Sequence, residues 1–218
     1  MGVQYKMRTF ASCSENLTIL MHHIFMKLIL ASNSPRRKEL LAGLEYPFEV
    51  RVMSDIDERY PETLQGEEIP IYISAQKAKA YLPTLAADEL LITADTVVML
   101  EGRVLGKPHD REDAIRMLTD LSGRTHEVIT GVTLATVESQ KSFASVSRVT
   151  FASLHPDDII HYVDHYRPFD KAGAYGIQEW IGFIGVTRIE GSYFNVMGLP
   201  VQRLYEELRR FCGVDLTK

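Results

Sequence analysis

The stretch LILASNSPRRKELL, residues 28–41, places a basic helix start directly after a short apolar segment. The apolar segment is typical of a buried strand, and Pro35 favours the first turn of a helix. Arg36, Arg37 and Lys38 then stand where the helix dipole already leaves partial positive charge, which they repel. A phosphate in front of the helix would offset this repulsion, because free N–H groups and basic side chains would converge on it. The alternative is that the three side chains are only solvated, as most charge runs are.

Helix-like and strand-like patterns alternate along the rest of the chain. Helices are expected in residues 67–82, 110–123, 156–166 and 200–211, from apolar spacing and from start and stop residues. Strands are expected in residues 47–53, 89–100, 126–137 and 142–154, the last two as an antiparallel pair across residues 138–141. This order predicts an α/β fold with a mixed central sheet.

The composition is that of one substantial globular domain. The chain has 218 residues, 45% of them hydrophobic, which suits one core or two lobes around a cleft. A net charge of -5 argues against a general binder of nucleic acid or of membrane surfaces. No apolar run reaches the roughly 18 residues that a membrane-spanning helix requires. Cys13 and Cys212 form no disulfide or metal-binding pattern, so a cytoplasmic protein is expected.

Residues 1–25 fit a signal peptide poorly, because polar residues precede a short apolar patch that histidines interrupt. We expect this segment to be a tail or a misassigned start, with Met26 as a candidate first residue. Residues 26–218 are then a single domain.

Asp95 is the most informative single residue, since it interrupts the apolar segment 89–100. A buried, unpaired carboxylate would cost several kcal/mol, so it must pair, bind a metal or face a cleft. A structural salt bridge is the alternative to a functional role. A functional role is favoured because further charged residues stand in Gly- and Pro-punctuated loops, where α/β proteins gather their ligands. These are Asp57, Glu58, Lys107 and Lys171.

Together with Arg36 and Lys77, these charged residues would suit phosphoryl chemistry. The cations would neutralise a polyphosphate, and Asp57, Glu58 and Asp95 are candidate ligands of Mg²⁺, with Mn²⁺ or Co²⁺ as alternatives. A carboxylate beside the metal could also accept a proton from an attacking water. His161 and His165, four residues apart, are a weaker metal candidate because a third ligand is missing.

Seven motifs occur along the chain in a characteristic order: LILASNSPRRKELL, QKAKAY, TADTVV, GKP, LSGRTHEVITGV, DKAGAYGIQ and GSYFNVMGLPV. This order resembles the Maf family, also called septum formation inhibitor proteins. The resemblance covers roughly residues 27–212. It implies a two-lobed mixed α/β fold with a deep cleft, similar to inosine triphosphate pyrophosphatases and often dimeric.

The resemblance also implies a nucleoside triphosphate pyrophosphatase that needs a divalent metal and releases a nucleoside monophosphate and pyrophosphate. The motifs carry over Asp95 as proton acceptor, with Lys77 and Lys107 as catalytic lysines. Substrate contacts would come from Ser32, Arg36, Arg37, Thr96, Lys171 and Gln178. At Asp57 some relatives have a glutamate, so Glu58 could substitute for it as a metal ligand.

Three positions indicate the subgroup within the family. Arg36, Thr96 and Gln178 are similar to the relatives that act on dTTP and UTP, rather than to those that act on 7-methyl-GTP. The amide of Gln178 offers a donor and an acceptor to the imide edge of thymine or uracil. The expected role is house-cleaning of pyrimidine triphosphates. The alternatives are a nucleotide-binding regulator of septum formation with incidental hydrolysis, and hydrolysis of purine triphosphates.

Overall fold

The computed structural model describes residues 26–54 and 56–213, so the expectations for residues 1–25 lie outside the described residues. The strands are β1 (Lys27–Leu30), β2 (Phe48–Val50), β3 (Glu89–Leu100), β4 (Arg103–Leu105), β5 (Thr125–Ala135), β6 (Gln140–Phe151) and β7 (Val186–Glu190). The α-helices are α2 (Pro35–Ala42), α3 (Glu68–Tyr81), α4 (Arg111–Leu121), α5 (Pro156–Tyr166), α6 (Trp180–Gly185), α7 (Tyr193–Met197) and α8 (Val201–Phe211). Two 3-10 helices are η1 (Leu82–Thr84) and η2 (Ala172–Ala174).

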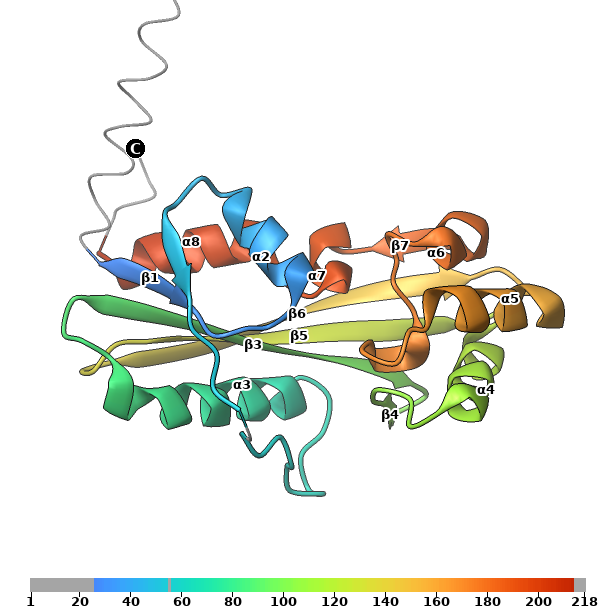
Figure 1. Cartoon of the computed structure of the whole chain (residues 1–218), viewed down its shortest axis with the longest axis horizontal. Helices are drawn as coiled ribbons and strands as arrows, with labels where there is room; N and C mark the ends of the chain where they lie inside the picture. The colour runs from blue at the N-terminus through green and yellow to red at the C-terminus, as the bar shows by residue number, and fades with distance from the viewer. Residues whose placement is uncertain (1–25, 55, 214–218) are drawn as a thin grey trace, which may run out of the picture.

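In the described part of the chain, all seven strands form one mixed sheet of order β2-β1-β3-β5-β6-β7, with β4 added beside β3. Strand β1 is parallel to both β2 and β3, whereas the long strand β5 is antiparallel to its two neighbours, β3 and β6. These three strands run the length of the molecule (Figure 1). The mixed α/β fold expected from the sequence is therefore confirmed.

Strand β3 has a gap along one edge, and this gap positions the site. Its start pairs with β1 as far as Ile92, and its end pairs with β4 from Val98 onward. Both short strands lie opposite β5, which pairs with β3 from Leu91 to Met99. Between them, residues 93–97 have no strand partner on that edge. Polar side chains can therefore enter the sheet there without breaking a hydrogen-bond ladder.

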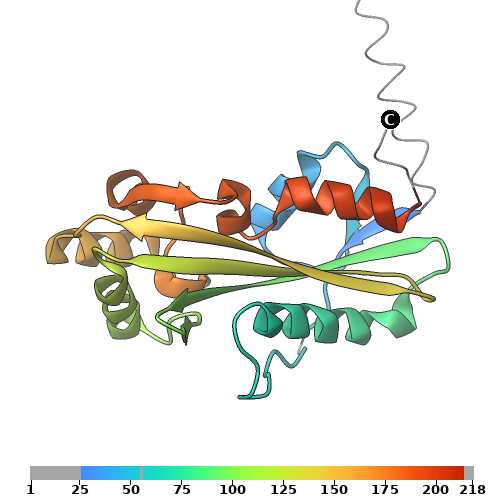
Figure 2. The same ribbon diagram turned by 180° about the vertical axis from the view of Figure 1, so that it is seen from behind.

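Two hydrophobic cores lie on either side of this gap, so the expected two lobes are observed. The β1 lobe is built from β1, the start of β3, α2 and α8, with fully buried Leu30, Ile92 and Leu204 at its centre. The α5 lobe is built from the other ends of the long strands with α4, α5 and α6, around Leu118 and Tyr162. Figure 2, from behind, shows α8 along one face of the sheet and α3 along the other.

Most of the expected elements are found close to their expected bounds. Helix α5 and strand β3 match the expected ranges, and α4 begins after its N-cap Asp110, whose side chain accepts a hydrogen bond from the backbone N–H of Asp113. Strand β2 is shorter than expected. The glycine-rich segment 170–200 contains η2, α6, β7 and α7, which no sequence pattern had predicted. Among the described residues, no helix combines the length and apolar character needed to cross a membrane.

Candidate active site

A cavity of about 820 Å³ opens at the gap in β3, between the two lobes. Ten of the eleven site residues expected from the sequence line it: Ser32, Arg36, Arg37, Glu58, Lys77, Asp95, Thr96, Lys107, Lys171 and Gln178. The eleventh, Asp57, does not. Residues that stand up to 146 positions apart, from Ser32 to Gln178, thus share one concave surface.

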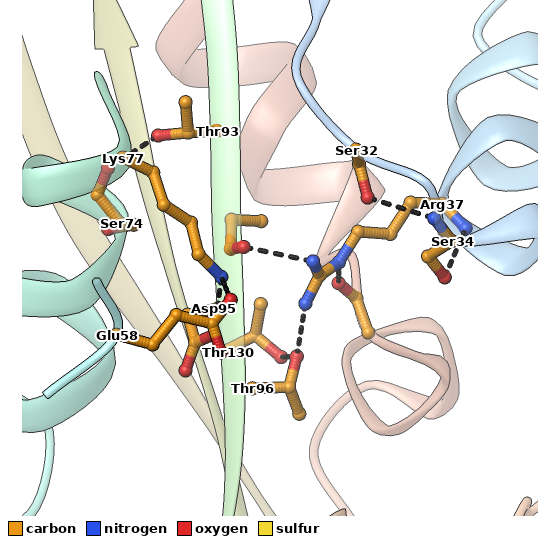
Figure 3. A network of polar contacts seen from close by, with 12 residues as sticks. Ser32, Ser34, Arg37, Glu58, Ser74, Lys77, Thr93, Asp95, Thr96 and Thr130 are labelled. Atoms are coloured by element: carbon orange, nitrogen blue, oxygen red, sulfur yellow. Dashed lines mark hydrogen bonds and ion pairs between the residues drawn. The ribbon is translucent and has the colours of Figure 1, made fainter. Parts of the chain in front are cut away.

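The centre of the cavity is a cluster of Lys77 with two carboxylates, which we call the Lys77 cluster. Lys77 Nζ lies 2.8 Å from Asp95 Oδ1 and 2.8 Å from Glu58 Oε1 (Figure 3). The side chains of Lys77 and Asp95 are mostly buried, with 13% and 14% of their surfaces exposed. Within β3, Asp95 and Thr96 are the two residues that are not fully buried. The polar interruption of this strand therefore faces the cavity.

Close packing of α3 against the sheet sets the position of Lys77. Gly131, the register partner of Asp95 on β5, lies so near α3 that an added Cβ would stand 2.3 Å from the carbonyl carbon of Pro70. One turn further along α3, the Ser74 hydroxyl lies 2.9 Å from the hydroxyl of Thr133. Because Pro70, Ser74 and Lys77 share one helix face, these contacts bring the Lys77 side chain over Asp95.

The structure distinguishes the two adjacent acidic residues Asp57 and Glu58. Asp57 is exposed and binds Arg59 through both carboxylate oxygens, at 2.7 to 3.0 Å, which lowers its pKa to about 2. Burial alone would raise the pKa of Glu58, but Lys77 and two more distant cations outweigh it and hold that pKa below its ordinary value. Glu58 is thus the acidic residue of this loop that faces the cavity as a carboxylate.

Two further cations stand on the cavity wall. Arg36, at the start of α2, makes an ion pair of 3.4 Å with Asp170, which precedes η2 in the other lobe. Lys107 is exposed and makes no ion pair with the described residues. Asp170 is a residue whose part in the site the sequence reasoning had missed, although it stands inside the DKAGAYGIQ motif. The Asp170 carboxylate pairs with the Arg36 guanidinium, which was expected to hold phosphate.

Arg37 is a structural hub rather than a solvated side chain. Its guanidinium donates hydrogen bonds to the carbonyl oxygens of Gly198 and Ala94 at 2.8 and 2.9 Å, and to the hydroxyl of Thr96 at 3.0 Å. Ala94 lies in the unpaired part of β3, so Arg37 supplies a donor that the missing strand would have given. The solvated alternative for the basic run is wrong for this residue.

A chain of hydroxyl groups continues from Arg37 through the sheet. Thr96 Oγ1 lies 2.9 Å from Thr130 Oγ1, and Thr130 donates to the backbone carbonyl of Asn195 at 3.1 Å. Asp95 and Thr96, as neighbours in a strand, point to opposite faces. Figure 3 accordingly shows Lys77 and Arg37 approaching β3 from opposite sides. Thr130 has no distinctive sequence signal, because it is one of several threonines in an apolar strand.

Gly176 and Gln178 line another part of the cavity, and we call residues 176–179 the Gln178 loop. The side-chain oxygen of Gln178 is buried and has no hydrogen-bond partner in the described part of the chain. Tyr175, which precedes the loop, is buried and binds His126 with 2.7 Å between its hydroxyl and Nε2. Burial lowers the pKa of His126 to about 4, so the imidazole is neutral. Gln178 therefore lines the cavity with a buried acceptor whose lost hydrogen bond only a further donor could restore.

A divalent cation fits the donors present. No group of three or more His, Cys, Asp or Glu side chains able to hold a metal occurs among residues 26–54 and 56–213. The pair His161 and His165 therefore has no third ligand. Glu58 and Asp95 offer two carboxylates on one Lys77 Nζ, and Mg²⁺ commonly takes one or two carboxylates together with substrate phosphates and water.

The chain is similar to one protein family, to several curated proteins and to solved structures. The Maf-like protein family model matches residues 27–211. A dTTP/UTP pyrophosphatase of Bacteroides fragilis is 61% identical over 184 residues, which are 84% of this chain and 95% of that protein. One from Flavobacterium psychrophilum is 50% identical over 179 residues, 82% of this chain and 91% of that protein. Among solved structures, a HAM1 protein from Coxiella burnetii is 14% identical, with a TM-score of 0.45 over 85% of this chain and 99% of that chain. The family match covers nearly all of the described residues, and the chain belongs to the Maf family.

Proposed function

We propose that this protein is a nucleoside triphosphate pyrophosphatase that hydrolyses dTTP and UTP. The observation that carries the proposal is Asp95, a carboxylate in an otherwise buried strand, hydrogen-bonded to Lys77 and facing a cation-lined cavity. Two relatives of at least 50% identity have the name dTTP/UTP pyrophosphatase, which supports the reaction and the substrate class.

Asp95 is proposed as the proton acceptor. Water attacks one of the two phosphorus atoms that share the α–β bridging oxygen, and its proton passes to the Asp95 carboxylate. The bond between that phosphorus atom and the bridging oxygen breaks. The products are pyrophosphate and a nucleoside monophosphate. Lys77 orients the carboxylate through its 2.8 Å hydrogen bond and adds positive charge beside the phosphates.

Lys107 and Arg36 are proposed to hold the triphosphate. Lys107 has no competing ion pair within the described residues, so its charge is available to phosphate. Arg36 would exchange the Asp170 carboxylate for a phosphate oxygen, since both are anionic acceptors of guanidinium hydrogen bonds. Arg37 and Ser32 are proposed to shape the same end of the cavity, Arg37 through the hydrogen bonds of its guanidinium.

Glu58 and Asp95 are proposed as the metal ligands, and Asp57 is left out because it is exposed, pairs with Arg59 and does not line the cavity. A bound divalent cation would draw charge from the phosphate oxygens and make water a better nucleophile. The choice of Mg²⁺ over Mn²⁺ or Co²⁺, the homodimer and the cytoplasmic location stay predictions from the sequence.

Gln178 is proposed to read the base. Its buried, unpaired oxygen would accept the N3–H of thymine or uracil. A base without that donor would leave the oxygen unpaired, which is how buried polar groups discriminate among ligands. Selection for pyrimidine triphosphates fits a role in house-cleaning of nucleotide pools.

The test is a panel of canonical and modified triphosphates with purified protein and Mg²⁺, assayed for pyrophosphate release. The expected result is release from dTTP and UTP, with much slower release from dATP and dGTP. No release from any pyrimidine triphosphate would contradict the proposed reaction, and faster release from purine triphosphates would contradict the proposed base choice.

A further inference from the structure

The Gln178 loop has little backbone structure of its own. It lies between η2 and α6, and its turn is closed by one hydrogen bond of 3.0 Å from the Glu179 N–H to the Gly176 carbonyl oxygen. No strand ladder supports these residues, so their position depends on side-chain contacts. The contacts come from a helix of the α5 lobe.

Tyr162, on α5, binds both ends of this loop. Its hydroxyl accepts a hydrogen bond of 3.0 Å from the Gly176 N–H and donates to Glu179 Oε2. The ring is fully buried. Burial, together with the hydrogen bond to Glu179, raises the pKa of Tyr162, so the hydroxyl keeps its proton. The loop is therefore closed by one buried hydroxyl group that acts as acceptor and donor at once.

The second carboxylate oxygen of Glu179 also has a partner, Lys171. Glu179 Oε1 lies 3.2 Å from Lys171 Nζ, whose side chain is 9% exposed and also lies 2.8 Å from Asp170 Oδ1. The carboxylate fills the space beside Gly176, where an added Cβ would stand 2.7 Å from its carbon atom. Gln178 is thus the residue directly before a carboxylate that two buried partners hold in place.

We propose that Tyr162 and Glu179 are positioning residues that hold the amide of Gln178 in the cavity and so set the preference for a pyrimidine imide edge. This inference rests on the proposed function, because it takes Gln178 as the base-reading residue. Lys171 then acts through Glu179. It orients the loop through its ion pair with the Glu179 carboxylate.

The test compares Tyr162→Phe and Glu179→Gln with Tyr166→Phe. Tyr166 lies on the same helix, is 42% exposed and stacks on Tyr162 at 5.0 Å between ring centroids, so it is a matched control. Binding of the products dTMP and dCMP is followed by the fluorescence of Trp180, the single tryptophan of the chain, which directly follows Glu179. Steady-state hydrolysis of dTTP and dCTP gives kcat and KM for each variant.

Both variants are expected to raise the Kd of dTMP and the KM of dTTP about tenfold, with kcat changed less than about threefold and dCMP affinity unchanged. Tyr166→Phe should match the wild type. A merely structural role would lower Tm and the active fraction but leave the dTMP to dCMP ratio intact, which would overturn the inference. If the wild type binds dTMP selectively without hydrolysing dTTP, the proposed function fails, and the Kd ratio of the variants still decides the inference. A wild type that does not distinguish dTMP from dCMP overturns it.

Discussion

The Lys77 cluster and the Gln178 loop line one cavity but are built in different ways. Asp95 and Lys77 of the cluster stand on a strand and a helix, whose backbone hydrogen bonds hold them in place, and Glu58 joins them from a loop. The loop stands on irregular backbone that Tyr162 and Lys171 hold through Glu179. The comparison teaches that reacting groups here have rigid supports, whereas the base-reading group depends on a few buried side-chain contacts.

Removing the proton acceptor should have the largest effect, since Asp95 is the residue proposed to take the proton of the attacking water. Asp95→Asn keeps an acceptor for Lys77, so the fold and nucleotide binding should survive. Pyrophosphate release from dTTP should fall roughly 1,000-fold, within the usual range for a lost general base. The measurement is kcat for pyrophosphate release, beside dTMP affinity from Trp180 fluorescence.

Asp57→Asn is the matched control, since Asp57 is exposed and bound to Arg59 outside the cavity. It should leave kcat unchanged.

A septum phenotype that survived Asp95→Asn would favour a nucleotide-binding regulator over an enzyme.

Variants of Arg37 and Arg36 should differ, because Arg37 supports the fold whereas Arg36 is proposed to contact the ligand. Arg37→Met leaves two carbonyl groups and Thr96 without their donor, so the free energy of unfolding should fall by about 4 kcal/mol. Arg36→Met breaks an ion pair whose aspartate is 60% exposed, so the loss should stay under about 1 kcal/mol while KM for dTTP rises. Urea unfolding of the two variants measures the difference. Equal losses in the free energy of unfolding would contradict the structural role of Arg37.

Acid should weaken the side of the cavity that carries the Gln178 loop, through His126. Burial lowers the pKa of His126 from its ordinary value of 6.5 to about 4, so between these values the unfolded chain binds a proton that the folded chain does not. Stability from this group is complete above pH 6.5 and is lost as pH falls toward 4, by up to about 3 kcal/mol.

The check is the free energy of unfolding between pH 7 and pH 5.5, above the range in which carboxylates titrate. His126→Phe should remove the dependence, and His109→Gln, which changes an exposed histidine, should keep it. A wild-type stability that is flat over this interval would contradict the buried neutral imidazole.

The same contrast explains what the sequence could and could not predict. Asp95 could be found because a carboxylate is conspicuous in an apolar strand, and helices α4 and α5 because their apolar spacing is regular. The role of Arg37 could not be predicted, because three basic residues in one helix turn look alike in the sequence. Only the structure shows that the gap in β3 leaves the Ala94 carbonyl open to Arg37. Tyr162 could not either. It has the spacing of a core residue in α5, and only the folded chain brings its hydroxyl to Gly176, 14 positions away.

The ion pair between Arg36 and Asp170 joins the two lobes, and breaking it should have the smallest effect. Burial would raise the pKa of Asp170, but the Lys171 hydrogen bond and the charges of Lys171 and Arg36 hold it below its ordinary value, so the carboxylate competes with phosphate at neutral pH. Asp170→Asn removes that competitor. Because exposed ion pairs are weak, KM for dTTP should fall only about threefold, with kcat unchanged. In the Arg36→Met background the same substitution should have no effect on KM, since no guanidinium remains to be released. A KM that rises on Asp170→Asn, or a fall that persists without Arg36, would show that Asp170 acts through Lys171 and the Gln178 loop instead of through the phosphate-binding guanidinium.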